Sequence, residues 1–112
     1  MQSKPNFEAH VVILPHYEKP DEIEVYPHTR FCKLAAGSCV VFTNLTQREY
    51  LIEGVQEFSH ETESSLRIGK TPKSVELDTG SVNEGTPYEY DIKDVTTGTT
   101  MIGNPRIVIP RR

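Results

Sequence analysis

The chain has no tryptophan, only two cysteines and no long apolar run. A transmembrane helix needs about 20 consecutive apolar residues, whereas the longest apolar run here covers Val11 to Leu14. No membrane role is therefore expected. The first residues, Met1 to Pro5, are polar and lead into Phe7 without the apolar segment of a secretory signal. A cytoplasmic location is the resulting expectation.

Positive charge is also scarce, because 12 Lys and Arg face 16 Asp and Glu, for a formal net charge of -4. Nucleic-acid binding depends on clustered Lys and Arg side chains that release counterions from phosphates. The only basic cluster is formed by Arg106, Arg111 and Arg112, close to the C-terminal end. The charge pattern therefore predicts no nucleic-acid partner.

The two cysteines, Cys32 and Cys39, flank a turn predicted at Ala36–Ser38. Strands entering and leaving that turn could bring the thiols close enough to form a disulfide. A reducing cytoplasm favours two free thiols instead. His28 stands four residues before Cys32, which is the residue pair of a thiol-dependent enzyme. A thiol-based enzyme at Cys32 is therefore one functional alternative.

Histidine is sparse, and none of the four histidines stands in a His-x-His or His-x3-His spacing. A transition-metal site would have to draw His16, His28 and His60 from loops at one end of the fold. A metal-binding protein or metal-dependent enzyme of this kind is the second alternative. The chain has no glycine-rich phosphate loop and no workable catalytic triad. No catalytic residue and no cofactor are predicted.

What the chain does contain is the period-2 alternation of β-strands. Tyr88, Tyr90 and Ile92 share one face of a predicted strand, while Glu89 and Asp91 share the other. Seven or eight short strands with a turn about every ten residues predict an all-β, antiparallel Greek-key β-sandwich. Residues 1–112 form one predicted domain, with 1–6 and 110–112 as flexible ends. The clearest other strands are Ala9–Leu14, buried on both faces, and Glu22–Tyr26, Cys39–Thr43, Ser64–Ile68, Lys73–Leu77 and Arg106–Ile109.

The stretch Asn44–Phe58 fits two structures. Thr46–Glu49 matches a helix capping box, whereas Gly54 interrupts the helical spacing and Tyr50–Ile52 has the composition of a strand. A strand over Tyr50–Ile52 followed by a loose turn is the favoured prediction.

Three segments follow one another in an order that resembles the strand skeleton of cupredoxins, the plastocyanin-like domains. They are Val40–Asn44, Tyr88–Ile92, and Met101–Gly103 running into Ile107–Ile109. The resemblance implies a cupredoxin-like sandwich, and an immunoglobulin-like sandwich is the alternative. In copper-carrying cupredoxins a His follows the first of these strands, and a Cys, a His and a Met lie between the last two.

The copper-ligand set of that family is missing from this chain. Glu49 or Tyr50 stands in the region of the first His, Asp91–Asp94 in that of the Cys, and Val95–Gly98 in that of the second His. Met101 alone falls where a ligand would. Blue copper is held by a thiolate and two imidazoles, with Met only as a weak axial ligand. The resemblance therefore implies a scaffold without copper, with Met101 as a core-filling side chain.

These observations predict a non-enzymatic binding or structural module. Its partner would be an unknown protein or a second copy of the chain, because the short edge strand Glu22–Tyr26 could pair with either to give a homodimer. Tyr17, Tyr26 and Tyr50 are candidate interface anchors, since exposed tyrosines often serve in that role.

Overall fold

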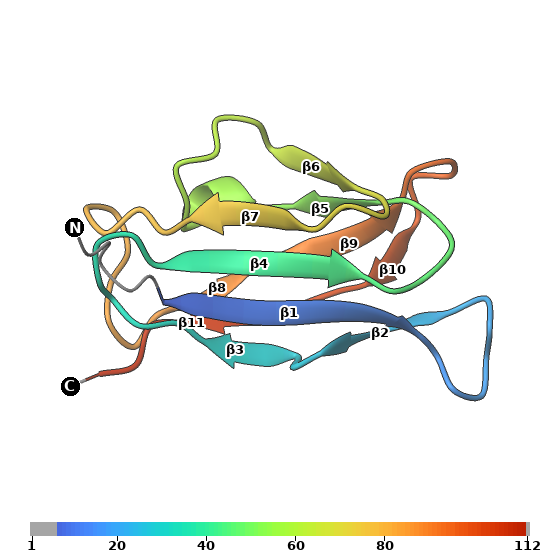
Figure 1. Cartoon of the computed structure of the whole chain (residues 1–112), viewed down its shortest axis with the longest axis horizontal. Coiled ribbons are helices and arrows are strands. Elements are labelled where there is room, and N and C mark those ends of the chain that lie inside the picture. The colour runs from blue at the N-terminus through green and yellow to red at the C-terminus, as the bar shows by residue number, and fades with distance from the viewer. Residues whose placement is uncertain (1–6, 112) are drawn as a thin grey trace, which may run out of the picture.

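The computed structural model describes residues 7–111, which form eleven β-strands and a single turn of 3-10 helix (Figure 1). The all-β prediction is confirmed, since no α-helix occurs in residues 7–111. Nor does this part of the chain hold a helix able to cross a membrane. The elements are β1 (Glu8–Pro15), β2 (Ile23–Tyr26), β3 (Thr29–Phe31), β4 (Cys39–Asn44), β5 (Tyr50–Glu53), η1 (Val55–Glu57), β6 (Ser65–Ile68), β7 (Lys73–Glu76), β8 (Pro87–Glu89), β9 (Asp91–Asp94), β10 (Thr100–Ile102) and β11 (Arg106–Val108).

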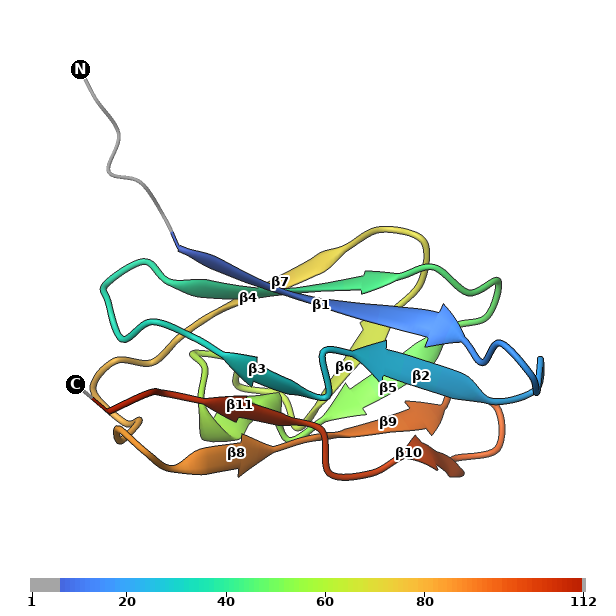
Figure 2. The same ribbon diagram turned by 90° about the horizontal axis from the view of Figure 1, so that it is seen from below.

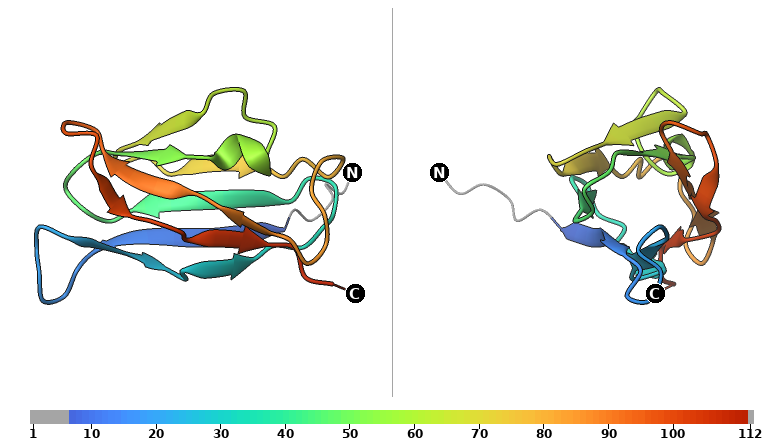
Figure 3. Two further views of the ribbon diagram at one scale, coloured as in Figure 1. Left: turned by 180° about the vertical axis from the view of Figure 1, so that it is seen from behind. Right: turned by 90° about the vertical axis from the view of Figure 1, so that its right-hand side faces the viewer.

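The strands form two layers around one apolar core. One layer is a sheet in the order β2-β1-β4-β7. The other layer consists of two sheets that adjoin end to end, in the orders β10-β9-β5-β6 and β3-β11-β8. Figure 2 shows β1, β4 and β7 along one side and β8 to β11 along the other, and the end-on view in Figure 3 shows the strands surrounding the core. The layers meet at Phe42 and Tyr90, whose rings pack edge to face with centroids 5.4 Å apart.

The strand count exceeds the seven or eight predicted because long strands bend when they change partners. β2 and β3 are separated by two residues, β8 and β9 by Tyr90 alone, and β10 and β11 by the segment 103–105. In each pair the first strand belongs to a different sheet from the second. If each pair counts as one bent strand, eight continuous runs remain. The alternation of side chains continues through such a bend, so the sequence pattern does not reveal it.

The predicted antiparallel pairing holds for most neighbouring strands, but each layer also contains one parallel pair. β1 lies parallel to β4, with Glu8 opposite Cys39, and β3 lies parallel to β11, with Thr29 opposite Arg106. Parallel neighbours require a connection that crosses to the other end of the sheet. The chain makes the first crossing through β2 and β3. Both kinds of pairing produce the same side-chain alternation, which left them indistinguishable in the sequence.

The expectation that β1 is buried on both faces was also wrong. Ala9, Val11 and Ile13 are buried, but the alternate residues Val12 and Leu14 are only half-buried. β1 is a central strand, paired with β2 on one side and β4 on the other. A two-layer sandwich covers only one face of each sheet, so the outward residues of this apolar strand remain partly open to solvent.

The ambiguous stretch is resolved as predicted, with β5 over Tyr50–Glu53 and only the short turn η1 after it. The Asn44 side chain organises the loop between β4 and β5. The Asn44 amide donates to the Arg48 carbonyl at 2.6 Å, and its carbonyl oxygen accepts the backbone N–H of Thr46 at 3.0 Å. Gly54 begins η1 with φ of 98°, a left-handed conformation that favours glycine.

The end of the chain contacts the loop before β8. Gly85 donates its backbone N–H to the Ile109 carbonyl at 2.6 Å, and the Arg111 side chain lies against the Gly85 backbone. The Tyr88 hydroxyl accepts the backbone N–H of Asn83 at 2.7 Å, which ties the same loop to the strand that follows it. Residues 1–6 and Arg112, expected as flexible ends, lie outside the described residues.

Candidate functional site

Two loops that are far apart in the sequence converge at one end of the molecule. The loop after β4 and the hairpin turn between β9 and β10 both lie at the end where the β4 arrow points (Figure 1). They enclose a hollow of about 480 Å³, which we call the end hollow. It is lined by Gln47, Arg48, Glu49, Asp94, Val95, Thr96 and Thr97. The resemblance to cupredoxins would place metal ligands in these two loops.

The turn on one side of the end hollow follows Asp94, between β9 and β10. The Asp94 carboxylate accepts the backbone N–H groups of Thr96 at 2.7 Å and Thr97 at 3.1 Å. Gly98, at φ of 73°, donates its N–H to the Asp94 carbonyl at 2.8 Å. These hydrogen bonds, with that from Thr97 contributing most, and the charge of Arg48 lower the pKa of Asp94. Asp94 is therefore an ionised turn residue whose acceptor oxygen is already engaged.

On the other side of the end hollow, Glu49 is engaged as well. Its carboxylate accepts a hydrogen bond from the Arg67 guanidinium of β6 at 2.7 Å. This hydrogen bond, followed by the charge of Arg67, lowers the pKa of Glu49. Arg48 is an exposed cation whose nearest carboxylate is that of Asp21, at 3.9 Å. Both carboxylates of the lining are thus already engaged by other groups of the chain.

The residues in the ligand positions do not fit a copper ion. Tyr50 is buried in the core, and Ile92, within the region of the ligating Cys, is completely buried. Met101 is half-buried and packs against the core, as predicted for a core-filling side chain. Copper in this family needs sulfur and imidazole donors, whereas the end hollow presents carboxylates, a guanidinium and hydroxyls. The residues at this end of the fold therefore do not support copper chemistry.

The three candidate metal-ligating histidines lie at separate places. His16 follows the last residue of β1, and its Nδ1 accepts the backbone N–H groups of Glu18 and Lys19, each at 3.1 Å. His60 lies near the opposite end, beside Glu76, which pairs with Cys39 at the start of β4. The eight residues of β1 span about 25 Å at ~3.3 Å per residue.

His28 stands between these two positions, in the connection between β2 and β3. Residues 7–111 contain no group of three or more His, Cys, Asp or Glu side chains able to hold a metal ion. His16, His28 and His60 thus do not come together as a shared metal site would require.

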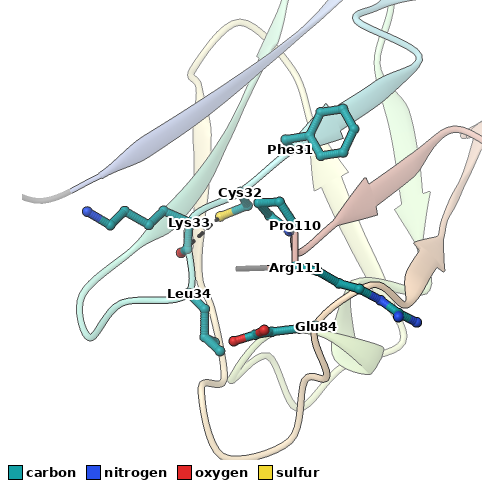
Figure 4. A pocket seen from close by; sticks show the side chains of 7 residues that line it. All are labelled: Phe31, Cys32, Lys33, Leu34, Glu84, Pro110 and Arg111. Atoms are coloured by element: carbon teal, nitrogen blue, oxygen red, sulfur yellow. Dashed lines mark hydrogen bonds between the residues drawn. The ribbon is translucent and has the colours of Figure 1, made fainter.

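Cys32 lies beside a second hollow, of about 250 Å³ (Figure 4). The lining residues are Phe31, Cys32, Lys33, Leu34, Glu84, Pro110 and Arg111. The thiol is 2% exposed and points toward the Lys33 carbonyl at 3.9 Å. Burial is the largest influence on the pKa of Cys32 and raises it, against a smaller lowering by Arg30. A raised pKa leaves little thiolate at neutral pH.

No imidazole lines the Cys32 hollow, and His28 lines a different hollow beside Tyr26. The predicted Cys–His pair therefore lacks the arrangement that a thiol nucleophile needs. Cys32 and Cys39 are free thiols in the structure, with Cys32 buried and Cys39 half-buried.

The candidate interface anchors have mixed outcomes. Tyr17 and Tyr26 are 80% and 71% exposed, as expected of interface residues, whereas Tyr50 is 2% exposed and the expectation for it was wrong. Tyr50 faces inward because it lies on the same face of β5 as the completely buried Ile52. The sequence interpretation missed Phe31, which is 58% exposed. Its position next to the buried Cys32 is the signal that could have placed it on the outer face.

Comparisons with known proteins found no match to this chain. No protein-family model matches the sequence, no curated protein matches it, and no solved structure matches the fold. Functional inference therefore depends on the chemistry of the chain itself.

Proposed function

We propose that this chain is a cupredoxin-like sandwich that works as a non-enzymatic binding or structural module without a copper site. The observation that carries this proposal is the chemistry of the end hollow. Its carboxylates already accept hydrogen bonds from Thr96, Thr97 and Arg67. Carboxylates engaged in this way hold the loops in place, and the lining adds no sulfur or imidazole donor for copper.

The positions of the resembling segments support the scaffold part of the proposal. Val40–Asn44 covers β4, Tyr88–Ile92 runs from β8 into β9, and Met101 lies in β10. The loop after β4 and the turn before β10 meet at the end hollow. Two loops that held one metal ion between them in an ancestral scaffold would have to lie close together. The resemblance therefore requires this convergence.

The partner in this role is a protein, either unrelated or a second copy of the chain. Exposed aromatic side chains at Tyr17, Tyr26 and Phe31 support a protein contact. The charge of the chain and the absence of a basic face at the end hollow argue against nucleic acid.

Metal analysis tests the proposal directly. The chain is expressed without a histidine tag, purified without chelator, and its copper, zinc, iron, nickel and manganese contents are measured by plasma mass spectrometry. The expected result is far less than one metal ion per chain and an unfolding curve that EDTA does not change. Stoichiometric metal would contradict the proposal. Its loss in either His16→Ala or His60→Ala would then assign the site to the loop histidines.

Thiol reactivity tests the enzyme alternative. The raised pKa and burial of Cys32 predict slow alkylation by iodoacetamide at neutral pH. The half-buried Cys39 is expected to react faster. Single-cysteine variants Cys32→Ala and Cys39→Ala, followed by mass spectrometry over time, give the two rates. Faster labelling at Cys32 than at free cysteine in solution would support a thiol enzyme instead.

A further inference from the structure

One face of the molecule carries exposed aromatic side chains along a continuous stretch. β2 and β3 run end to end across this face (Figure 2), and we call Asp21–Lys33 the edge ribbon. Tyr26 is 71% exposed and Phe31 is 58% exposed. Large exposed aromatic residues of this kind are typical of the centres of protein interfaces.

The two halves of the edge ribbon carry opposite charge. The half that contains β2 has carboxylates at Asp21, Glu22 and Glu24, whereas the half that contains β3 has cations at Arg30 and Lys33. The carboxylates make only longer contacts, such as 3.6 Å from Glu24 to His16 and 3.6 Å from Glu22 to Lys19. Exposed pairs of this length stabilise a fold little, so these carboxylates remain available to a partner.

The arginines around β3 have no carboxylate partner among the described residues. Elsewhere Arg67 pairs with Glu49 at 2.7 Å. In contrast, Arg30 and Arg106, which lie on the neighbouring strands β3 and β11, form no ion pair within residues 7–111. Both side chains are half-buried, and their Nε atoms are enclosed by the chain itself, so their positive charge has no compensating carboxylate in this part of the chain.

The charges are arranged symmetrically about Pro27. Residues equally distant from Pro27 on its two sides complement one another when the edge ribbon is paired with a reversed copy of itself. Glu24 would lie opposite Arg30 and Asp21 opposite Lys33. Such complementarity of a segment with itself is the requirement of a two-fold symmetric interface.

We propose that two copies of this chain associate through their edge ribbons, antiparallel, about a two-fold axis that passes near Pro27. A second copy is favoured over an unrelated partner because one sequence supplies both the acidic and the basic half. The proposal names the partner in the binding role proposed above and rests on that role.

The surface beside the edge ribbon has room for the partner's aromatic side chain. A mainly apolar hollow of about 520 Å³ adjoins Tyr26 and is lined by Leu14, Glu24, Val25, Tyr26, Pro27, His28 and Ile102. The exposed His28 of one copy would face Tyr26 of the other across the axis. A standard interface buries about 800 Å² per partner, about a tenth of the 7022 Å² surface of the chain.

Sedimentation equilibrium of the full chain, from low to high micromolar concentration, tests the proposal. A reversible dimer is expected, and its dissociation constant is expected to rise with salt because the contacts are charged. A monomer at every concentration would overturn the proposal.

Charge reversal identifies the surface. Glu24→Arg and Arg30→Glu are each expected to raise the dissociation constant about tenfold or more, because each places two pairs of like charges in contact. The double variant Glu24→Arg/Arg30→Glu is expected to restore dimerisation. Matched controls are Glu63→Arg and Lys70→Glu, exposed residues outside the edge ribbon, which should leave the constant unchanged. A dimer that tolerates both single reversals would overturn the proposal.

Arg30 is only half exposed, so its reversal could impair folding. Phe31→Ser and Tyr26→Ser remove exposed side chains, and each is expected to weaken the dimer with an unchanged circular dichroism spectrum. A dimer unaffected by both would contradict the edge-ribbon contact. If the chain proves to be a metal-free monomer, only the proposed dimer is overturned. If it proves to be a dimer that carries stoichiometric metal, only the proposed metal-free binding role is overturned.

Discussion

The end hollow and the edge ribbon are both polar surfaces, but they satisfy their charged groups in different ways. At the end hollow, Asp94 binds the turn that follows it and Glu49 binds Arg67. Along the edge ribbon, Arg30 has no carboxylate partner among the described residues, and Tyr26 and Phe31 are largely exposed.

Under the proposed binding role, this difference favours the edge ribbon as the contact surface. A loop cluster whose hydrogen bonds close on themselves is a structural cap, because binding a ligand there would first have to break them. A surface with unpaired cations and exposed aromatic rings has fewer existing interactions to break when a partner binds. The unpaired charged groups and exposed aromatic side chains therefore lie along the edge ribbon rather than at the end hollow.

The largest expected effect concerns the core beneath the end hollow. Ile92 is completely buried and pairs with Ile52 and Ile102 on neighbouring strands. Ile92→Ala is expected to lower the free energy of unfolding by about 2–5 kcal/mol through the cavity that it leaves. Urea unfolding measures the change. Val95→Ala, half-buried in the adjoining turn, should cost less than about 1 kcal/mol. A tolerated Ile92→Ala would contradict the structural role of this end.

Smaller effects on stability are expected when Tyr88 and Tyr90 are replaced by Phe, and the two effects are expected to have opposite signs. The Tyr88 hydroxyl accepts the Asn83 N–H, whereas the buried Tyr90 hydroxyl has no hydrogen-bond partner within residues 7–111. Tyr88→Phe is expected to lower the free energy of unfolding by about 1 kcal/mol. Tyr90→Phe is expected to raise it by about 1 kcal/mol, because it removes an unsatisfied buried group. Equal losses in the two variants would show that Tyr90 has a partner in solution.

Burial also raises the pKa of Tyr90. The unfolded chain would therefore lose this proton first, at its ordinary pKa of about 10. The stability of the wild type is complete below that pH and is expected to fall above it. Tyr90→Phe should show a weaker alkaline decline, and an identical decline would contradict the assignment.

The smallest expected effect is the acid response of the end hollow. The pKa values of Asp94 and Glu49 are lowered by hydrogen bonds, from Thr97 and Arg67 respectively. Their contribution to stability is complete above the unfolded values of about 4 and is lost as the pH falls through the folded ones. Unfolding free energies measured from pH 6 to pH 2 should decline less in Asp94→Asn than in the wild type. Glu63→Gln, a control for the loss of one exposed carboxylate, should follow the wild type, and the same curve for all three would refute the account.

The strands that could be predicted from the sequence are those whose alternation is local. β4 and β7 were found from their apolar residues, and the turn at Thr96–Gly98 from its residue types. β3 and the breaks between sheets were missed. Tyr88, Tyr90 and Ile92 keep one inward face while the hydrogen-bond partner changes from β11 to β5 and β10. Partner choice is a long-range property that alternation does not encode.

The site was less predictable than the fold. The resemblance indicated the two loops that meet at the end hollow, but not that Glu49 would be held by Arg67, 18 residues away. The histidines gave the wrong arrangement, because sequence spacing did not reveal that His16 and His60 lie near opposite ends of the first layer. The exposure of Phe31 depends on which face of a three-residue strand points outward, and so short a strand gives no periodicity to measure.

The most direct test of the contrast between the two surfaces is a dilution series of two-dimensional amide NMR spectra of the uniformly labelled chain. The account predicts that signals of the edge ribbon, including Glu24, Tyr26, Arg30 and Phe31, shift or broaden with concentration. Signals of the end hollow, such as Glu49, Asp94 and Thr97, are predicted to stay unchanged. Concentration-dependent shifts confined to the end hollow, with a constant edge ribbon, would contradict it.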